Sequence, residues 1–174
     1  MHVMTRFYVK EVHTPIGLLT IVSSDKGLTH LSFGPLNKAN LAARLARFGM
    51  KPEWLELGEN ESLLAAEQLM EYFNGERQEF DVSIDLIGTP FQKKVWSALN
   101  TITYGETKSY KEIAEMIGAP KAVRAVGGAN NQNPLPIIIP CHRVIGSNGA
   151  MVGYGGGLTN KERLLSLESK MKIS

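Results

Sequence analysis

The spacing of hydrophobic residues changes at Gly88, and this change constrains the fold more than any other feature of the sequence. Before Gly88, runs with strand composition over 7–12, 18–23 and 28–33 are separated by tight turns, which is typical of an antiparallel meander. After Gly88, hydrophobic residues recur at helical spacing behind capping sequences. We therefore expect two domains, residues 1–87 and residues 88–174.

The first domain is expected to be α/β, with an antiparallel sheet and helices. Hydrophobic residues recur at helical spacing over 41–48, and Gly49 can end that helix in a left-handed conformation. The pattern over 62–73 predicts a second helix. Apolar and polar residues alternate over 80–86, which predicts a further strand.

The second domain is expected to be mainly α. Residues 89–92 form a capping box with Pro at the first helical position. Residues 109–112 form another, which opens a short helix with Ile113 and Met116 directed inward. Pro120 then begins the next helix. Two short helices joined by so tight a turn predict a helix-turn-helix.

The second helix of this pair has an unusual exposed face. At 100° per residue, Val123 and Val126 fall together and should face the core. The opposite side carries two cations and two small residues, Lys121, Arg124, Ala125 and Gly128. Small residues allow close approach and cations attract phosphate, so the groove of a duplex is a natural partner. From this segment alone, a tightly packed helix with solvated charges is an equal alternative.

Cys141 is the only cysteine in the 174 residues, which excludes an internal disulfide and a multi-cysteine zinc site. The four histidines show no ligand spacing, so no structural metal is expected. Residues 137–139 predict a short buried strand before Cys141. Inert packing is the usual role of a free cysteine. Here His142 and Arg143 follow directly, and a thiol needs such a base or cation to become a thiolate.

His142 could act on the thiol through a water, because adjacent side chains seldom meet directly. Such a base needs an orienting group. A helix opened by a capping box at 159–162 places Glu168 on one face with Leu164 and Leu165. A carboxylate on an apolar face is costly unless it is partnered, so Glu168 is the candidate. The alternative is that Glu168 reaches solvent near the helix end.

Glycines crowd residues 146–157 around Tyr154, which indicates either a loop whose backbone lines a pocket for a flat ligand or a plain irregular loop. The net charge is only +2, so nucleic-acid binding would need a local patch. No apolar run approaches the ~18 residues of a membrane span. We expect a soluble, intracellular protein with a reduced thiol.

Together these residues resemble the O6-alkylguanine-DNA alkyltransferases. The resemblance covers about residues 88–169 and rests on Ile139-Pro140-Cys141-His142-Arg143-Val144-Ile145, on Asn133-Pro134 before it, and on Tyr154-Gly155-Gly156-Gly157 after it. It implies a ribonuclease-H-like α/β domain followed by a winged helix-turn-helix-like domain. The first half resembles the family only in length and pattern.

The resemblance implies DNA repair by irreversible, single-turnover transfer of the alkyl group of O6-alkylguanine to Cys141 after base flipping, with O4-alkylthymine left open as a second substrate. His142 would be the water-mediated base, Glu168 would orient it, and Asn133 would support the site by hydrogen bonds. Tyr110 would rotate the target's 3′ phosphate and could supply a proton.

The resemblance further implies contacts with double-stranded DNA, which a monomer would bind in the minor groove with little sequence specificity and no cofactor. Arg124 would fill the space left by the flipped base. The same helix face would supply Lys121, Ala125 and Gly128. The guanine pocket would be lined by Val144, Tyr154, Gly155 and Gly156. Some members have a serine where Gly155 stands, and its hydroxyl can hydrogen-bond the guanine O6. Backbone groups would have to make that hydrogen bond here.

Three other functions compete with alkyl transfer. A damage-sensing protein of the same fold would bind the lesion without chemistry, but its relatives carry a non-nucleophilic residue where Cys141 stands. A helix-turn-helix regulator would need a dimer and side chains that read bases, which the small residues of the exposed helix face lack. A thiol hydrolase would need a means of activating water. The sequence favours alkyl transfer.

Overall fold

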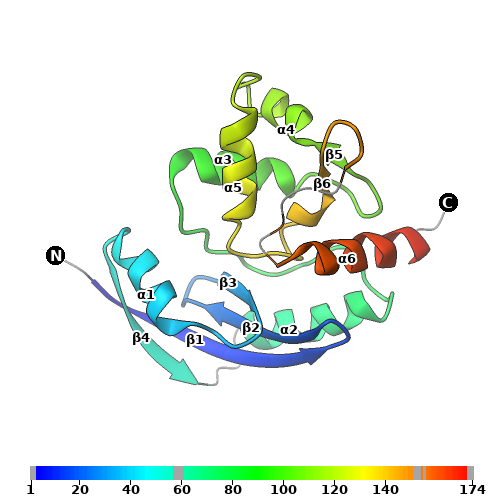
Figure 1. The fold of residues 1–174 in the computed structure, drawn as a ribbon. Coiled ribbons are helices and arrows are strands. Elements are labelled where there is room, and N and C mark those ends of the chain that lie inside the picture. The colour runs from blue at the N-terminus through cyan, green and yellow to red at the C-terminus, as the bar shows by residue number, and fades with distance from the viewer. Residues whose placement is uncertain (1–2, 57–60, 151–153, 155, 172–174) are drawn as a thin grey trace. The chain divides into compact units, whose positions relative to one another are not determined.

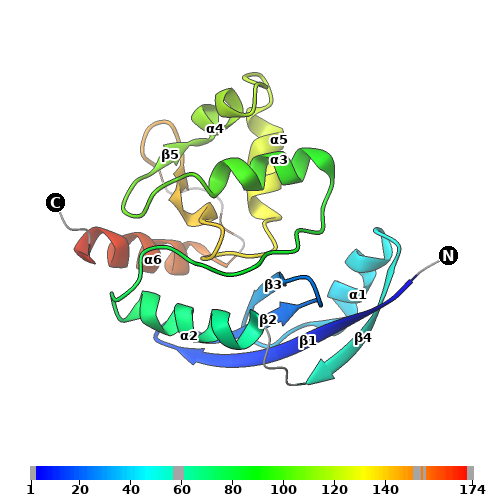
Figure 2. The ribbon, with the colours of Figure 1, turned by 180° about the vertical axis from the view of Figure 1, so that it is seen from behind.

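The computed structural model describes residues 3–56, 61–150, 154 and 156–171. The chain divides into two compact units, Met1–Gly88 and Thr89–Ser174, and this division differs from the expected boundary by one residue. Figures 1 and 2 show the elements of each unit from opposite sides. The expected class, an α/β unit followed by a mainly α unit, is confirmed.

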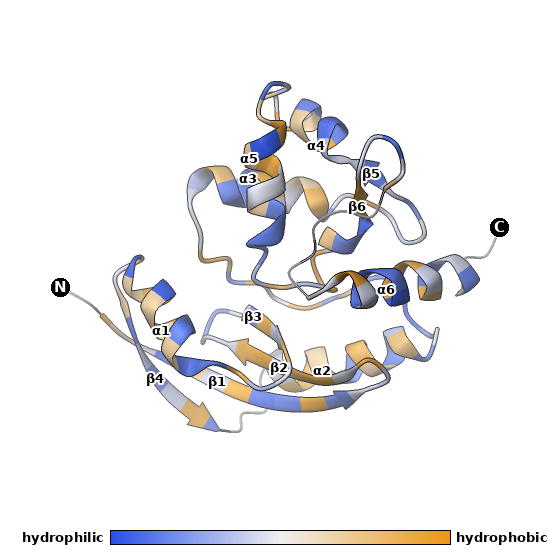
Figure 3. Ribbon diagram, in the orientation of Figure 1, coloured by the Kyte–Doolittle hydropathy of each residue, from blue (hydrophilic) through white to orange (hydrophobic). Residues whose placement is uncertain are grey.

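The first unit is built on a four-stranded sheet in the order β3-β2-β1-β4. The expected antiparallel meander consists of β1 (Val3–Thr14), β2 (Gly17–Ser23) and β3 (Leu28–Phe33). An unexpected strand, β4 (Met50–Glu56), pairs with β1 in parallel, so the sheet is mixed rather than antiparallel. In Figure 3, β2 is hydrophobic along most of its length, whereas β1 alternates. This difference follows burial, because most of β2 is buried and most of β1 is only partly buried or exposed.

Helices α1 (Lys38–Ala46) and α2 (Glu61–Phe73) cover opposite faces of this sheet. On one face, Val22 packs in a buried cluster with Leu41 and Leu45 of α1. The next residue of β2, Ser23, points to the other face and hydrogen-bonds Ser62 of α2 at 2.6 Å. Accordingly, α1 lies in front of the sheet in Figure 1, and α2 lies in front in Figure 2.

The strand predicted over 80–86 is wrong. Ile84 makes only one isolated parallel bridge, with Leu28. The Gln68 carboxamide binds both backbone groups of Asp81, donating to its carbonyl at 3.1 Å and accepting from its N–H at 2.8 Å. A side chain thus takes the hydrogen bonds that a neighbouring strand would need, and the alternating pattern does not become a ladder.

The second unit contains four α-helices, a short 3-10 helix and a two-stranded parallel pair among its described residues. These are α3 (Pro90–Leu99), β5 (Lys108–Ser109), α4 (Tyr110–Met116), α5 (Val123–Asn131), η1 (Cys141–Arg143), β6 (Val144–Ile145) and α6 (Leu158–Met171). Thr89 and Ser109 form the two predicted capping boxes. The fully buried Trp96 of α3 donates to the carbonyl of Ala129 at 2.9 Å, which joins α3 to α5.

Three helical details differ from the sequence prediction. Met116 is 48 % exposed, because α4 is only seven residues long and reaches the core through Ile113 and Ala114. Pro120 lies in the turn before α5, which begins at Val123. Val123 is 38 % exposed, because it is the first residue of the helix, while Val126 is fully buried as expected.

The capping box predicted at 159–162 is also wrong. α6 already begins at Leu158, so Thr159 lies inside its first turn. The backbone N–H of Lys161 bonds the carbonyl of Gly157 at 3.1 Å, and the Asn160 side chain bonds the carbonyl of Gly156 at 3.0 Å. The helix therefore starts from the glycine-rich segment rather than from a hydroxyl cap.

Candidate active site

The segment before Cys141 is a turn held by Asn133, not the predicted strand. The Asn133 carboxamide donates to the carbonyl of Ile139 at 2.8 Å and accepts from the N–H of Leu135 at 3.1 Å. Ile137 has φ 75°, a conformation that costs a β-branched residue about 1–3 kcal/mol. The isoleucines are buried as expected, but the side-chain bonds of Asn133 close the chain on itself. This turn fixes where η1 begins.

Cys141 is the first residue of η1 and is 3 % exposed. Burial raises the pKa of its thiol to about 11, although a hydrogen bond from Asn133 and the charge of Lys161 act to lower it. A thiol with its pKa raised in this way is protonated at neutral pH. The resting group is therefore a thiol, and a base must take its proton before it can attack.

The next residue, His142, lies in hydrogen-bond contact with Glu168 of α6, with 2.7 Å between Nε2 and Oε2. Both side chains are buried. Burial acts to raise the pKa of Glu168, but hydrogen bonds from His142 and Arg143 outweigh it and lower this pKa to about 2. An ionised carboxylate only accepts, so Nε2 of His142 carries a proton.

The other ring nitrogen of His142, Nδ1, is buried and has no hydrogen-bond partner among the described residues. Burial lowers the pKa of His142, and the charges of Arg143 and Lys161 lower it further, against the opposite effect of Glu168. The ring is therefore neutral, with a lone pair on Nδ1. This arrangement can accept a proton from a thiol or from an intervening water.

Arg143 binds Glu168 more extensively than His142 does, and the sequence had marked it only as a neighbouring cation. Its Nε donates to Oε1 at 2.8 Å and its Nη2 to Oε2 at 2.9 Å. Its Nη1 donates to the carbonyl of Ile102 at 2.6 Å, and its guanidinium lies 5.7 Å from the centre of the Tyr104 ring. No local sequence pattern predicts these partners, because they are distant from Arg143 in the sequence.

Lys161 is a second cation that the sequence reasoning missed. It is fully buried on α6, and its Nζ donates to the carbonyl of Val144 at 2.5 Å. A signal did exist, because Lys161 stands at helical spacing from Leu164, Leu165 and Glu168 on one face. Its charge acts to lower the pKa of Cys141. Lys161 thus joins α6 to the strand that follows the cysteine.

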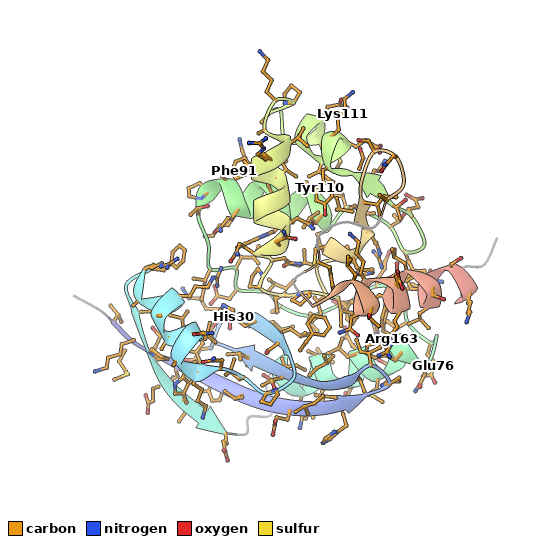
Figure 4. All side chains as sticks on the ribbon, viewed as in Figure 1. His30, Glu76, Phe91, Tyr110, Lys111 and Arg163 are labelled. Carbon is orange, nitrogen blue, oxygen red and sulfur yellow. The ribbon has the colours of Figure 1, made fainter. Side chains whose placement is uncertain are left out.

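Two half-buried tyrosines lie near the thiol. Burial, followed by the charge that Cys141 would carry, raises the pKa of Tyr110 and raises that of Tyr154 well above 10. A hydrogen bond with Asn130 acts in the opposite direction on Tyr110. Figure 4 shows Tyr110 and Lys111 at the start of α4, with Lys111 at the edge of the unit. Both tyrosines can therefore donate protons at neutral pH.

Among the other predicted pocket residues, Val144 is fully buried and its backbone N–H bonds the carbonyl of Cys141, while Gly156 is partly buried. Gly155 lies outside the described residues. The predicted exposed face of α5 and its preceding turn is present, with Lys121, Arg124, Ala125 and Gly128 all exposed. A Cβ added at Gly128 would meet nothing within 4 Å. These four residues lie on the surface, apart from the hydrogen-bonded cluster of Cys141.

Among the described residues, no group of three or more His, Cys, Asp or Glu side chains could hold a metal ion. In the same part of the chain, every helix is too short or too polar to cross a membrane.

Comparison with known proteins gives the site its family. Residues 6–86 match the family model of the ribonuclease-like domain of 6-O-methylguanine DNA methyltransferase. Residues 90–170 match the model of the DNA-binding domain of the same proteins. The chain belongs to the 6-O-methylguanine DNA methyltransferase family.

Relatives are similar along nearly the whole chain. The methylated-DNA–protein-cysteine methyltransferase of Mycolicibacterium paratuberculosis is 49 % identical, over 92 % of this chain and 92 % of its own. That of Methanosarcina barkeri is 48 % identical, over 92 % and 96 %. The crystal structure of Mycobacterium tuberculosis O6-methylguanine methyltransferase is 44 % identical with a TM-score of 0.79, over 97 % and 96 %. A structure of the M. tuberculosis protein in complex with DNA has a TM-score of 0.77.

Proposed function

We propose that this chain repairs duplex DNA by moving the alkyl group of O6-alkylguanine onto the thiol of Cys141, irreversibly and once per molecule. The observation that carries this proposal is the arrangement around the thiol. Cys141 directly precedes a buried, neutral His142, whose Nε2 is held by Glu168 and whose Nδ1 is left to accept a proton. The names of the relatives describe the same chemistry.

The transfer is an in-line displacement at the alkyl carbon. The proton of the Cys141 thiol passes through a water to Nδ1 of His142, and the sulfur attacks the carbon as the bond from that carbon to O6 breaks. The bonding electrons go to the guanine, which leaves as an anion or takes a proton from Tyr110. The thioether that forms is stable, so the protein acts once.

The buried position of Cys141 requires that the base be extruded from the stack. Extrusion costs a few kcal/mol and costs less for a damaged, poorly paired base. In our proposal, Tyr110 rotates the 3′ phosphate, Arg124 fills the space left in the duplex, and the extruded guanine lies against Tyr154 and Val144. The small residues of α5 permit close approach in the minor groove.

The distribution of charge supports DNA binding by the second unit. Thr89–Ser174 contains eleven Lys and Arg against five Asp and Glu, a net charge of +6. Met1–Gly88 contains eight against twelve, a net charge of −4. The small total of +2 thus hides a basic unit that attracts phosphate without reading sequence. We propose that a monomer binds, in a reducing cytoplasm or nucleoid where the thiol survives.

The direct test is transfer of a labelled methyl group from O6-methylguanine in a duplex to the protein. We expect label on the protein at about one equivalent, because one thiol is consumed per event. Cys141→Ala should abolish the transfer while remaining folded. Absence of transfer by intact, reduced protein would overturn the proposal. Repeating the assay with O4-methylthymine measures the second substrate.

The role of Arg124 has its own test. Arg124→Ala should slow transfer from duplex DNA strongly, because nothing then fills the gap left by the extruded base. Reaction with free O6-methylguanine needs no extrusion and should keep its rate. Equal slowing of both reactions would contradict a role for Arg124 in base flipping.

A further inference from the structure

Arg143 is a buried cation that the proposed transfer reaction does not use. The residue is 6 % exposed, and its side chain donates hydrogen bonds to three oxygens of buried residues, two on Glu168 and one on Ile102. The bidentate geometry with Glu168 is the strongest form of an arginine–carboxylate pair. Because Arg143 binds both oxygens of the carboxylate that holds His142, we expect it to affect the protonation of His142.

Glu168 is shared between two partners. Its Oε2 accepts from Nε2 of His142 at 2.7 Å and from Nη2 of Arg143 at 2.9 Å, while Oε1 accepts from Nε of Arg143. With a neutral imidazole, the three side chains sum to zero charge. Protonating the imidazole would leave a net positive charge buried, which is costly.

Removing the guanidinium would reverse this preference. The carboxylate of Glu168 would then face His142 alone, and a buried carboxylate favours the charged form of the histidine beside it. The neutral sum would then be reached only by an imidazolium paired with Glu168. The protonation state of His142 therefore depends on whether Arg143 is also bound to Glu168.

We propose that Arg143 is a positioning residue that keeps His142 neutral and protonated on Nε2 by occupying both oxygens of Glu168. This inference rests on the proposed function, because only there does His142 serve as a base. Nδ1 stays ready to accept a proton, and the thiol and imidazole both remain uncharged at rest. Cys141, which can react only once, is then not held as a standing thiolate–imidazolium pair that any electrophile could consume.

The other groups around His142 do not replace Arg143. Lys161 also opposes an imidazolium, but its Nζ is bound to the carbonyl of Val144 rather than to Glu168. Cys141, Tyr104 and Tyr154 are neutral at rest, because burial raises the pKa of each. The groups that face the cluster are Glu168 and Lys161 from α6, Cys141 and Arg143 from η1, Tyr104 from the loop before β5, and Tyr154 from the segment before α6.

The test is a titration of the His142 ring by nitrogen NMR, with the signals assigned by their loss in His142→Gln. In the wild-type protein we expect a neutral ring protonated on Nε2 around neutral pH. Arg143→Met should raise the titration midpoint of His142 by about one pH unit or more. Arg143→Lys, which keeps the charge but not the bidentate grip, should give a midpoint in between. Arg163→Gln, an exposed arginine on the same helix as Glu168, should change nothing.

A double variant separates electrostatics from damage to the structure. Arg143→Met with Glu168→Gln removes both charges, so the midpoint of His142 should fall back below that of Arg143→Met. The pH at which iodoacetamide alkylates Cys141 should follow, lower in Arg143→Met and restored in the double variant. If Arg143→Met does not fold, the midpoint of Arg143→Lys decides. An unmoved His142 midpoint in a folded Arg143 variant overturns the inference.

The two proposals can fail separately. If wild-type protein transfers no methyl group but the His142 midpoint still moves in the Arg143 variants, the proposed function is overturned. The effect of Arg143 on the protonation of His142 then still stands. Methyl transfer by wild-type protein, with no movement of the midpoint, would overturn the inference alone.

Discussion

At the scale of single residues, the site is organised by compensation of buried charge. Glu168 would be expensive to bury alone, and it is held at once by Arg143 and His142. Breaking a buried pair of this kind by removing one partner typically costs about 3–5 kcal/mol. The same contacts fix which nitrogen of His142 carries its proton. The stability of the fold and the tautomer of His142 thus both depend on the carboxylate of Glu168.

The coupling predicts an acid-sensitive fold. The pKa of Glu168 is lowered from 4.5 to about 2, so its stabilisation is fully present above pH ~4.5 and is lost as pH falls towards 2. The loss should be on the order of 3 kcal/mol. Denaturant unfolding at a series of pH values should show this slope in wild-type protein and a shallower one in Glu168→Gln. Equal slopes would contradict the assignment, whatever the absolute stabilities.

At the scale of elements, the segments that could be predicted are those whose cause is local. The capping boxes at Thr89 and Ser109 place donor and acceptor three residues apart, so the sequence alone fixes where α3 and α4 begin. The strand β4 was missed because its partners on β1 lie 47 residues away in the sequence, so the pairing leaves no local mark. The contact of Glu168 with His142 could be predicted because a carboxylate on an apolar helix face needs a partner. The contacts of Arg143 with the same carboxylate leave no such mark in the sequence.

The turn held by Asn133 gives an element-scale prediction. Asn133→Ala removes two hydrogen bonds that hold the strained Ile137 and the start of η1. Each bond lost with a buried partner costs about 1–3 kcal/mol, and methyl transfer should fall as Cys141 loses its position. Denaturant unfolding and transfer rates measure both effects. Gln132→Ala, an exposed neighbour, is the control, and a similar loss there would contradict this role for Asn133.

The exposed face of α5 gives a second prediction at this scale. Ala125→Leu should leave the folded protein intact, because Ala125 is exposed, but should weaken duplex binding by blocking close approach to the groove. Gel-shift titration with a duplex measures the effect. Ser166→Leu places the same side chain on the exposed side of α6 and should bind normally. Unchanged binding by Ala125→Leu would show that α5 does not enter the groove.

At the scale of the whole molecule, the separation of charge between the two units matters more than the total. The second unit carries +6 and the first −4, a division that is visible in the sequence once the boundary is known. Duplex binding should therefore weaken steeply with added salt, despite a total of +2.

The salt dependence can be assigned to one unit. The slope of log affinity against log salt is negative, and Lys121→Ala should make it less steep by about one if that side chain contacts a phosphate. Lys26→Ala, an exposed lysine of the first unit, should leave the slope unchanged. Fluorescence anisotropy over a series of salt concentrations measures both, and a larger effect of Lys26→Ala would place the DNA on the other unit.

The most direct test of the central claim is to find where the methyl group goes. The protein is incubated with an excess of duplex containing O6-methylguanine, digested, and mapped by mass spectrometry. The account predicts one added methyl group on the peptide that contains Cys141, with lesion loss that stops when the protein is consumed. A methyl group on another residue, or lesion loss that continues far beyond one per chain, would contradict it.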